Sequence, residues 1–259
     1  MSICVVFVCN KAYINKFEYT LNKLRTKGKY DKDITLVVGD DYKNNIDELK
    51  EKYNIDVVYF PEITFSDEWL NTFKKLKRRW GSKIFQYHKL NIFTEYFKKW
   101  DYIFYLDCGI HICEDISPIL KLCKKNKLLA HSDAYPKYER KLSCQFYSNI
   151  KDIYAQLNKE YDLTCDYFQT TIMLFSTEII TNDLFDKLLY LSKKYPISLL
   201  NDQSIIALYF TNIEKKWEQI ELQNNEICYY DYMRRSAKPY IMHKFCTPGP
   251  HPWYEACKT

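Results

Sequence analysis

An aspartate follows a run of apolar, β-prone residues near the middle of the chain. The run covers 102–106 and reads YIFYL, and Asp107, Cys108, Gly109 and His111 come after it. Carboxylate oxygens and imidazole nitrogens bind divalent cations, and a bound cation stabilises negative charge that develops on a substrate. Aspartate also ends strands simply because it favours turns. The segment is therefore open to two interpretations, a metal site or an ordinary turn.

His111 is a candidate second ligand beside Asp107. Side chains alternate along a strand, so residues 107, 109 and 111 share one face if the strand continues. Gly109 lies on that face and supplies no side-chain ligand. Three alternatives stay open: His111 supplies a second ligand, His111 faces the core or solvent and binds nothing, or the glycine allows close approach of a ligand or of backbone.

Polar residues also end or open other predicted elements. Asn10 follows a first apolar run, and Asp40 ends a second run in a Gly-Asp-Asp turn that needs no ligand to explain it. Asp202, in the segment NDQS, opens a helical pattern, where it or Asn201 could also act as a helix cap. These residues are candidates whose roles depend on where the strands and helices place them.

The elements that must position these residues alternate between strand and helix in the first half. Short apolar runs predict strands over 2–10, 33–41, 55–62 and 102–112, and helical spacing predicts helices over 15–26, 43–53 and 82–100. This order favours an α/β fold with a mainly parallel central sheet and helices on both faces. Ligands in such folds bind beyond the carboxyl ends of the strands. Asn10, Asp40 and Asp107 are therefore expected along one edge.

The second half has a more mixed pattern. It predicts strands over 126–134, 166–177 and 240–245, helices over 183–194 and 201–212, and a short strand pair near 217–231. No internal repeat or linker is visible. A chain of 259 residues that is 47% hydrophobic can bury one sizeable core, so we expect one domain over 1–259.

Composition narrows the class of protein further. The start of the chain lacks the features of a signal peptide and no apolar run reaches membrane-spanning length, so we expect a cytoplasmic protein without a transmembrane segment. The ten cysteines are scattered without a C-x-x-C pair, which favours reduced thiols. A net charge of +5, spread over helical faces, gives no reason to expect nucleic acid as a partner.

The five glycines exclude several nucleotide-binding motifs. They do not form the G-x-G-x-x-G loop of dinucleotide-binding folds or the phosphate-binding P-loop. The first apolar run is followed by a segment without glycine, which also argues against a nucleotidyltransferase.

Four segments in order give the chain a family resemblance. They are YIFYLD, YFQTTIML, NDQS and the final YIMHKFCTPGPHPW. This order resembles the glycogenin-like retaining glycosyltransferases, which have a GT-A fold and use UDP-sugar donors. The resemblance extends over nearly the whole chain and implies a nucleotide-binding half (1–112) and an acceptor-binding half with the C-terminal metal ligand (113–259). The chain departs from the family where Gly109 replaces the second aspartate of the D-x-D motif.

The resemblance implies roles for individual residues. Asp107 and His243 would hold Mn²⁺, or Mg²⁺, against the diphosphate of the donor. Asp202 would bind hydroxyls of the transferred sugar, and Gln203 would lie near its anomeric carbon. Further candidates for binding the nucleotide sugar are implied with them: Asn10, Tyr13, Asp40, Lys89, Asp133, Gln169 and Lys244, of which Tyr13 would stack on the base.

The tail departs from the family in a second place. His251 stands where the family has a lysine that binds the β-phosphate, so Lys244 or His251 is the candidate replacement, and Trp253 is expected to pack as a lid.

The expected activity is transfer of a hexose, glucose or galactose, from a UDP-sugar to a hydroxyl of a glycan, protein or lipid-linked sugar, with retention of configuration. Two alternatives stay open. An inverting enzyme would need a carboxylate base such as Asp202. A degenerate protein would bind the sugar nucleotide without catalysis, with Gly109 as the mark of that loss.

Overall fold

The computed structural model describes residues 1–76, 84–232 and 238–244. Two tail residues singled out in the sequence, His251 and Trp253, lie outside this part of the chain. No helix in the described ranges combines the length and the apolar character needed to cross a membrane. No disulfide joins two of the eight cysteines in the same ranges.

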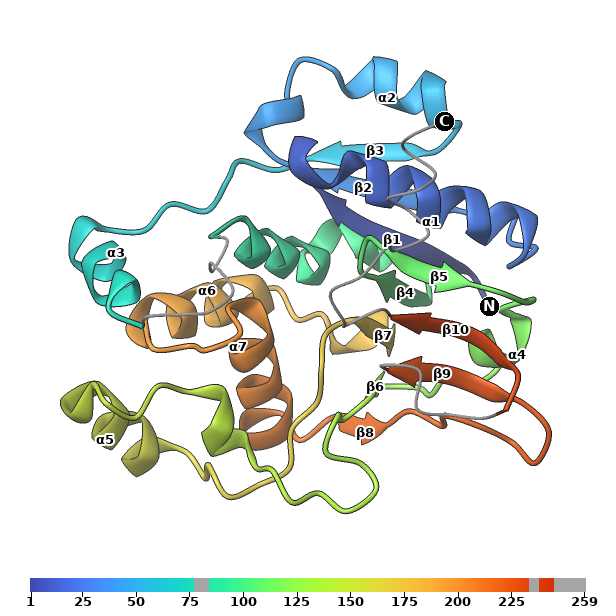
Figure 1. The fold of residues 1–259 in the computed structure, drawn as a ribbon. Helices are drawn as coiled ribbons and strands as arrows, with labels where there is room; N and C mark the ends of the chain where they lie inside the picture. The colour runs from blue at the N-terminus through green and yellow to red at the C-terminus, as the bar shows by residue number, and fades with distance from the viewer. Residues whose placement is uncertain (77–83, 233–237, 245–259) are drawn as a thin grey trace.

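A mixed seven-stranded sheet forms the centre of the fold (Figure 1). Its strand order is β3-β2-β1-β4-β7-β6-β8, and only β7 runs against its neighbours. The bounds are β1 Ile3–Cys9, β2 Ile34–Val38, β3 Asp56–Tyr59, β4 Tyr102–Leu106, β6 Leu128–Ala130, β7 Ile172–Ser176 and β8 Trp217–Gln219. The predicted α/β class with a mainly parallel sheet is confirmed.

A second sheet of three short strands lies beside the first. It has the order β5-β10-β9, with bounds β5 Ile110–Ile112, β9 Cys228–Tyr232 and β10 Tyr240–Lys244. β10 pairs antiparallel with β5, so that His243 lies opposite His111. The fold thus brings the end of the described chain next to the segment that follows β4.

Helices cover both faces of the large sheet because its strands are apolar on both sides. In β1, Val5 and Phe7 face one core and Cys4 and Val6 face the other. The first core includes α1, α2 and the small sheet, and the second includes α3, α6 and α7. The helices are α1 Ile14–Thr26, α2 Ile46–Tyr53, α3 Asp67–Lys74, α4 Ser117–Leu120, α5 Lys151–Glu160, α6 Leu184–Lys194 and α7 Asp202–Leu208, and a π-helix over Tyr209–Ile213 continues α7.

The segment predicted as one long helix over 82–100 differs in the structure. Its described part forms two 3-10 helices, η3 (Ile84–Phe93) and η4 (Glu95–Lys99), separated by Thr94 in an extended conformation. The Asn91 side chain donates to the carbonyl of His88, and the Thr94 hydroxyl donates to the carbonyl of Asn91. Such bonds occupy carbonyls that a continuous α-helix would use, which explains the break.

The predicted strand pair near 217–231 is also wrong in its pairing. β8 pairs with β6 in the large sheet, whereas β9 pairs with β10 in the small one. The segment between them is joined to β9 by an isolated bridge between Gln223 and Cys228 and by backbone hydrogen bonds from Tyr229 and Tyr230 to the carbonyl of Leu222. Local pattern alone identified the strands but not their partners, because pairing is set by distant residues.

Candidate active site

The ends of the parallel strands place the predicted polar residues along one sheet edge. β1 lies between β2 and β4, with Cys9 beside Val38 and Val6 beside Tyr105. Asn10, Asp40 and Asp107 follow these strands and so lie along the same edge, as predicted. Because β7 is reversed, its start at Ile172 lies beside the end of β4 at Leu106. The segment before β7 therefore reaches this edge as well.

A buried lysine connects two aspartates at this edge. The Nζ atom of Lys89 lies 3.2 Å from Oδ1 of Asp107 and 2.9 Å from Oδ2 of Asp202. It also donates to the hydroxyl of Thr170 at 3.0 Å. Lys89 is 8% exposed, so it is buried in the fold. Its two carboxylate neighbours outweigh the effect of burial and raise the pKa of Lys89, which keeps it charged.

Asp107 has a second lysine on its other oxygen. Oδ2 of Asp107 pairs with Nζ of Lys244, which extends from β10. Oδ1 accepts a hydrogen bond of 2.7 Å from the hydroxyl of Tyr105. Burial would raise the pKa of Asp107, but Lys244 and Lys89 outweigh it and lower the pKa to about 2. Asp107 is therefore ionised at neutral pH.

Asp202 lies in the first turn of α7, and its pKa is shifted in the opposite direction from that of Asp107. Burial is the largest effect and raises its pKa, although Lys89 lowers it. Its Oδ2 accepts a hydrogen bond of 3.0 Å from the hydroxyl of Thr170. Asp202 thus belongs to the same cluster as Asp107, but its carboxylate binds a proton more readily than that of Asp107.

Gln203 lies beside this cluster and is held at both ends of its amide. Its Oε1 accepts from the backbone N–H of Thr170 at 3.4 Å, and its Nε2 donates to Oε1 of Gln145 at 2.9 Å. The amide is thus fixed next to the carboxylate cluster.

Four buried acceptor atoms at or near this edge have no hydrogen-bond partner within the described ranges. They are Oδ1 of Asn10, Oδ1 of Asp41, Oε1 of Gln169 and Oδ1 of Asn201. A buried acceptor without a hydrogen-bond partner destabilises the folded state. Such atoms are therefore rare in folded proteins unless a ligand or water donates a hydrogen bond to them. These oxygens would accept hydrogen bonds from hydroxyl or amide groups of a ligand.

Asn201 combines this unpaired oxygen with an uncommon backbone. Its φ and ψ angles are 53° and −119°, and its side-chain amide donates to Gln86. A non-glycine residue in this region stores strain of about 1–3 kcal/mol, and such residues cluster at functional sites. The turn before α7 is held in this form by its surroundings.

Three other predicted residues make contacts of their own. Asp133 pairs with Arg140 at 2.8 Å and accepts from the hydroxyl of Tyr167 at 2.5 Å. Asp40 is exposed and accepts from the hydroxyl of Tyr59 at 2.7 Å. Tyr13 ends a 3-10 turn (Lys11–Tyr13) before α1, and the ammonium of Lys16 lies 4.9 Å from its ring.

His243 lies with His111 and Cys113, and Lys244 is the residue of β10 that contacts Asp107. Neighbouring residues on a strand face opposite ways, so His243 and Lys244 leave β10 on different sides. Asp107 shares no set of three or more ligands within the described ranges. Two ammonium groups already contact its carboxylate, and they repel a cation. As they lie, these residues do not fit an Mn²⁺ centre held jointly by Asp107 and His243.

Three further residues of the site are Tyr105, Gln145 and Asp41, which the sequence patterns above do not predict. Tyr105 precedes Asp107 by two residues and so shares its face, a signal available from strand alternation. Asp41 follows Asp40 in the same turn. Gln145 lies in a 3-10 turn (Leu142–Gln145) and has no local pattern that would mark it.

Comparison with known proteins places the fold. No protein-family model matches the chain, and no curated protein matches it in sequence. Among solved structures, the chain resembles the galactosyltransferase LgtC, solved with donor and acceptor sugar analogs, with a TM-score of 0.62 and 12% identity over 98% of this chain and 91% of LgtC. It also resembles mouse xyloside xylosyltransferase 1, with a TM-score of 0.54 and 10% identity over 97% of this chain and 99% of that one. The chain has a GT-A fold.

A third similar structure shows that this fold also occurs within longer proteins. The bifunctional glycosyltransferase WbbM matches with a TM-score of 0.60 and 13% identity over 99% of this chain but 51% of WbbM. In the GT-A fold of this chain, the cluster of Asp107, Lys89 and Asp202 lies at the carboxyl edge of the central sheet. This edge is where open α/β sheets bind their ligands.

Proposed function

We propose that the chain is a glycosyltransferase that moves a hexose, glucose or galactose, from a UDP-sugar to a hydroxyl group. The acceptor would be a glycan, a protein or a lipid-linked sugar bound by residues of the second half. The observation that carries the proposal is the buried cluster of Lys89, Asp107 and Asp202 at the ligand-binding edge of a fold that solved sugar transferases share.

The two lysines fit the charge of the proposed donor. Cleavage of the bond between the sugar and UDP leaves negative charge on the diphosphate, and ammonium groups in a buried site stabilise such charge. Lys244 has a side-chain exposure of 25%, so its side chain is partly open to solvent. Lys89 is nearly buried and stays next to both carboxylates. We infer that Lys244 binds the diphosphate while Asp107 keeps both lysines oriented.

Asp202 and Gln203 fit the sugar half of the donor. A carboxylate accepts hydrogen bonds from sugar hydroxyls, and an amide both donates and accepts. An active-site mutant of LgtC replaces a glutamine by glutamate, so that protein has a glutamine in its active site. Gln203 is our candidate for a comparable position. The unpaired oxygens of Asn10 and Gln169 would accept hydrogen bonds from the nucleotide or the sugar.

We propose retention of configuration. The acceptor hydroxyl would attack from the face that UDP leaves, and the departing phosphate oxygen would take its proton. NMR of the anomeric centre in the product tests this directly. A product with inverted configuration would rule out retention and would make Asp202 the base, since burial already raises its pKa.

The binding experiment measures thermal stability of the full chain with UDP-, GDP- and CMP-sugars, each with Mn²⁺, Mg²⁺ or EDTA. We expect UDP-sugars to stabilise the protein most, by about 2.7 kcal/mol at a concentration of 100 Kd. Asp107→Ala should lose this stabilisation, whereas Asp101→Ala, at the opposite end of β4, should keep it. Stabilisation by UDP-sugar that survives Asp107→Ala would contradict the proposed site.

The same series with EDTA tests the dependence on Mn²⁺ or Mg²⁺ that the family resemblance implies and that the two ammonium groups on Asp107 do not favour. Release of UDP, with and without acceptor, separates a transferase from a protein that binds the donor without turnover. Binding without any release over a broad acceptor panel would support the degenerate alternative.

A further inference from the structure

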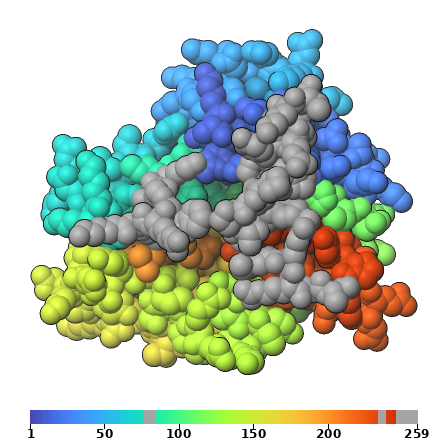
Figure 2. Space-filling model, in the orientation of Figure 1, coloured from blue at the N-terminus to red at the C-terminus, as the bar shows by residue number. Residues whose placement is uncertain are grey.

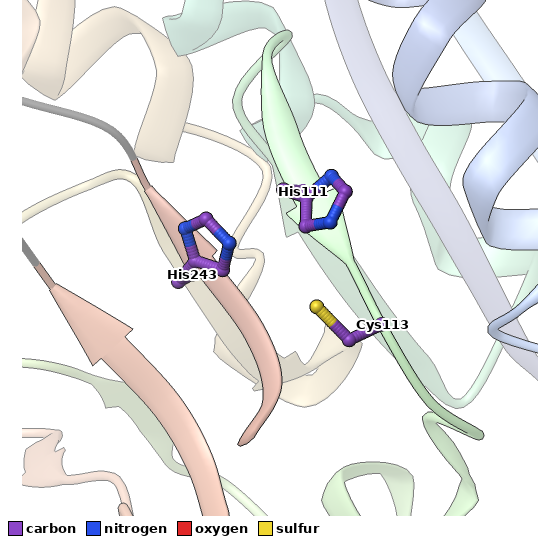
Figure 3. Close-up of side chains that lie close together, drawn as sticks. All are labelled: His111, Cys113 and His243. Carbon is purple, nitrogen blue, oxygen red and sulfur yellow. The ribbon is translucent and has the colours of Figure 1, made fainter. Parts of the chain in front are cut away.

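Two histidines and a cysteine meet between the last described strand and the strand after β4. Figure 3 shows His111 on β5, Cys113 just past the end of that strand, and His243 on the strand opposite. Their ligand atoms all lie within 4.8 Å of one another, and they are the one such set of three within the described ranges. Asp107 is not part of this set.

The pairing of β5 and β10 explains why these side chains converge. His111 lies directly opposite His243 in the antiparallel register, and their ring centroids are 4.9 Å apart. Cys113 follows His111 by two residues and therefore lies on the same face. The backbone N–H of Cys113 donates to the carbonyl of Ile241 at 2.7 Å, which continues the pairing to the end of the set.

The donor atoms determine which ions this set suits. Two imidazole nitrogens and one thiolate favour borderline or soft cations such as Zn²⁺, whereas Mn²⁺ and Mg²⁺ favour oxygen ligands. Tetrahedral Zn²⁺ with these ligands would place the ligand atoms about 3.5 Å apart. The three ligand atoms, which all lie within 4.8 Å of one another, would move closer together when they bind the ion.

We propose that Zn²⁺ binds between β5 and β10 through His111, Cys113 and His243. The hydroxyl of Tyr19, in α1, hydrogen bonds Nδ1 of His111. Metal-binding histidines commonly make such a bond through the nitrogen that does not bind the ion, and it orients the ring. The three side chains would supply three of the four ligands of a tetrahedral site. A solvent or substrate atom would complete it.

This site differs from the metal centre that the sequence predicts. That centre combines Asp107 with His243 and uses a hard ion on the donor diphosphate. The proposed site instead joins two strands on the opposite side of β10 from Lys244. By fixing β10 to β5, bound Zn²⁺ would hold Lys244 near Asp107. Binding of the ion does not depend on the proposed sugar transfer.

Metal binding to the full chain without any sugar nucleotide tests the proposal. Protein stripped of metal is titrated with Co²⁺, whose absorption reports a bond to thiolate, and Zn²⁺ affinity is measured against a chromogenic chelator. We expect one equivalent to bind, with a thiolate-to-Co²⁺ absorption band. Zn²⁺ should displace Co²⁺, and excess Mn²⁺ should not.

Two variants and one control complete the test. Cys113→Ser should remove the thiolate band, and both Cys113→Ser and His111→Gln should weaken Zn²⁺ binding at least tenfold, since loss of outer-shell partners alone costs about 10- to 100-fold. Cys144→Ser, at an exposed cysteine, should change neither. Circular dichroism confirms that each variant folds. Unchanged Zn²⁺ affinity in folded Cys113→Ser, or absence of stoichiometric binding in the parent, would overturn the proposal.

Discussion

The ammonium group of Lys89 lies between two carboxylates that come from opposite halves of the chain. Asp107 follows β4, and Asp202 opens α7 almost a hundred residues later. A buried ion pair is stable only while each charge keeps its partner, because an unpaired buried charge is very unfavourable. Removal of one member of the cluster should therefore destabilise the fold, because it leaves a buried charge without a partner.

Replacement of Lys89 by methionine tests this at the residue scale. Lys89→Met leaves Asp202 buried without its ammonium partner, so we expect a loss of about 3 kcal/mol in the free energy of unfolding at pH 7. The loss should be smaller at pH 5, because Asp202 has a raised pKa and can take a proton. Urea denaturation at both pH values measures it.

Lys98→Met is the matched control. Lys98 is exposed and pairs with Glu95 three residues earlier, an interaction worth at most about 0.5 kcal/mol. Equal losses for the two variants would show that the buried cluster has no special role in stability.

The lowered pKa of Asp107 gives a second residue-scale prediction. A carboxyl group whose pKa is lower in the folded state stabilises the fold above its unfolded pKa, and this contribution disappears as pH falls through the folded pKa. With a folded pKa of about 2, ionised Asp107 should contribute about 2 kcal/mol at pH 7.

The variant Asp107→Asn resembles the protonated form. Its stability deficit relative to the parent, measured by urea denaturation, should be largest at pH 7 and should fall to about half by pH 3. A deficit that stays constant between these pH values would contradict a lowered pKa.

At the scale of elements, the turn after β2 depends on the absence of a side chain at Gly39. A Cβ atom there would lie 2.9 Å from Cγ of Glu62 and 2.9 Å from Cε2 of Phe85. Gly39→Ala should shift the turn that carries Asp40 and Asp41. We expect a loss of about 1–3 kcal/mol in stability, as for other overpacked sites, together with weaker UDP binding in calorimetry.

Gly28→Ala provides the comparison. Its Cβ would lie 2.6 Å from the carbonyl oxygen of Leu24, at the end of α1. We expect it to lower stability but to leave UDP affinity unchanged in folded protein. The same loss of affinity in both variants would remove the specific link between the β2 turn and the nucleotide.

Sequence patterns predicted the elements better than their neighbours. The apolar runs of β1, β2 and β4 identify buried strands, and the rule for strand ends places Asn10, Asp40 and Asp107 at one edge. Pairing of β8 and β9 with different sheets depends on contacts with β6 and β10, which no local pattern contains. The arrangement of side chains at the site was harder to predict than the strands. A shift of one residue along β10 decides whether His243 or Lys244 faces Asp107.

At the scale of the whole molecule, the proposed function uses one edge of the large sheet. A hollow of about 910 Å³ lies at the opposite edge, lined by Asp31, Asp33, Ile34 and Asp56 near the starts of β2 and β3.

Figure 2 shows the N-terminal residues on one side of the viewed face and those after about residue 125 on the other. The two halves of the chain thus both contribute to this face.

Hydrogen exchange with UDP tests which edge is used. We expect slower exchange at residues 10–13, 40–42 and 107–109 when UDP binds, because ordered ligand contacts suppress local opening. Residues 31–34 and 54–56, at the other ends of the strands, serve as the internal control and should be unchanged. Protection centred on the control segments would place the nucleotide at the wrong edge for the proposed function.

The reversed direction of β7 has a consequence for how such a protein can diverge. The connection that enters β7 carries Gln169 and Thr170 to the edge where the parallel strands end, and it belongs to the second half of the chain. Connections on protein surfaces tolerate insertions far better than strands do. Lengthening or replacing the start of this connection could therefore give new acceptor preferences during evolution while the strands that bind the nucleotide keep their registers.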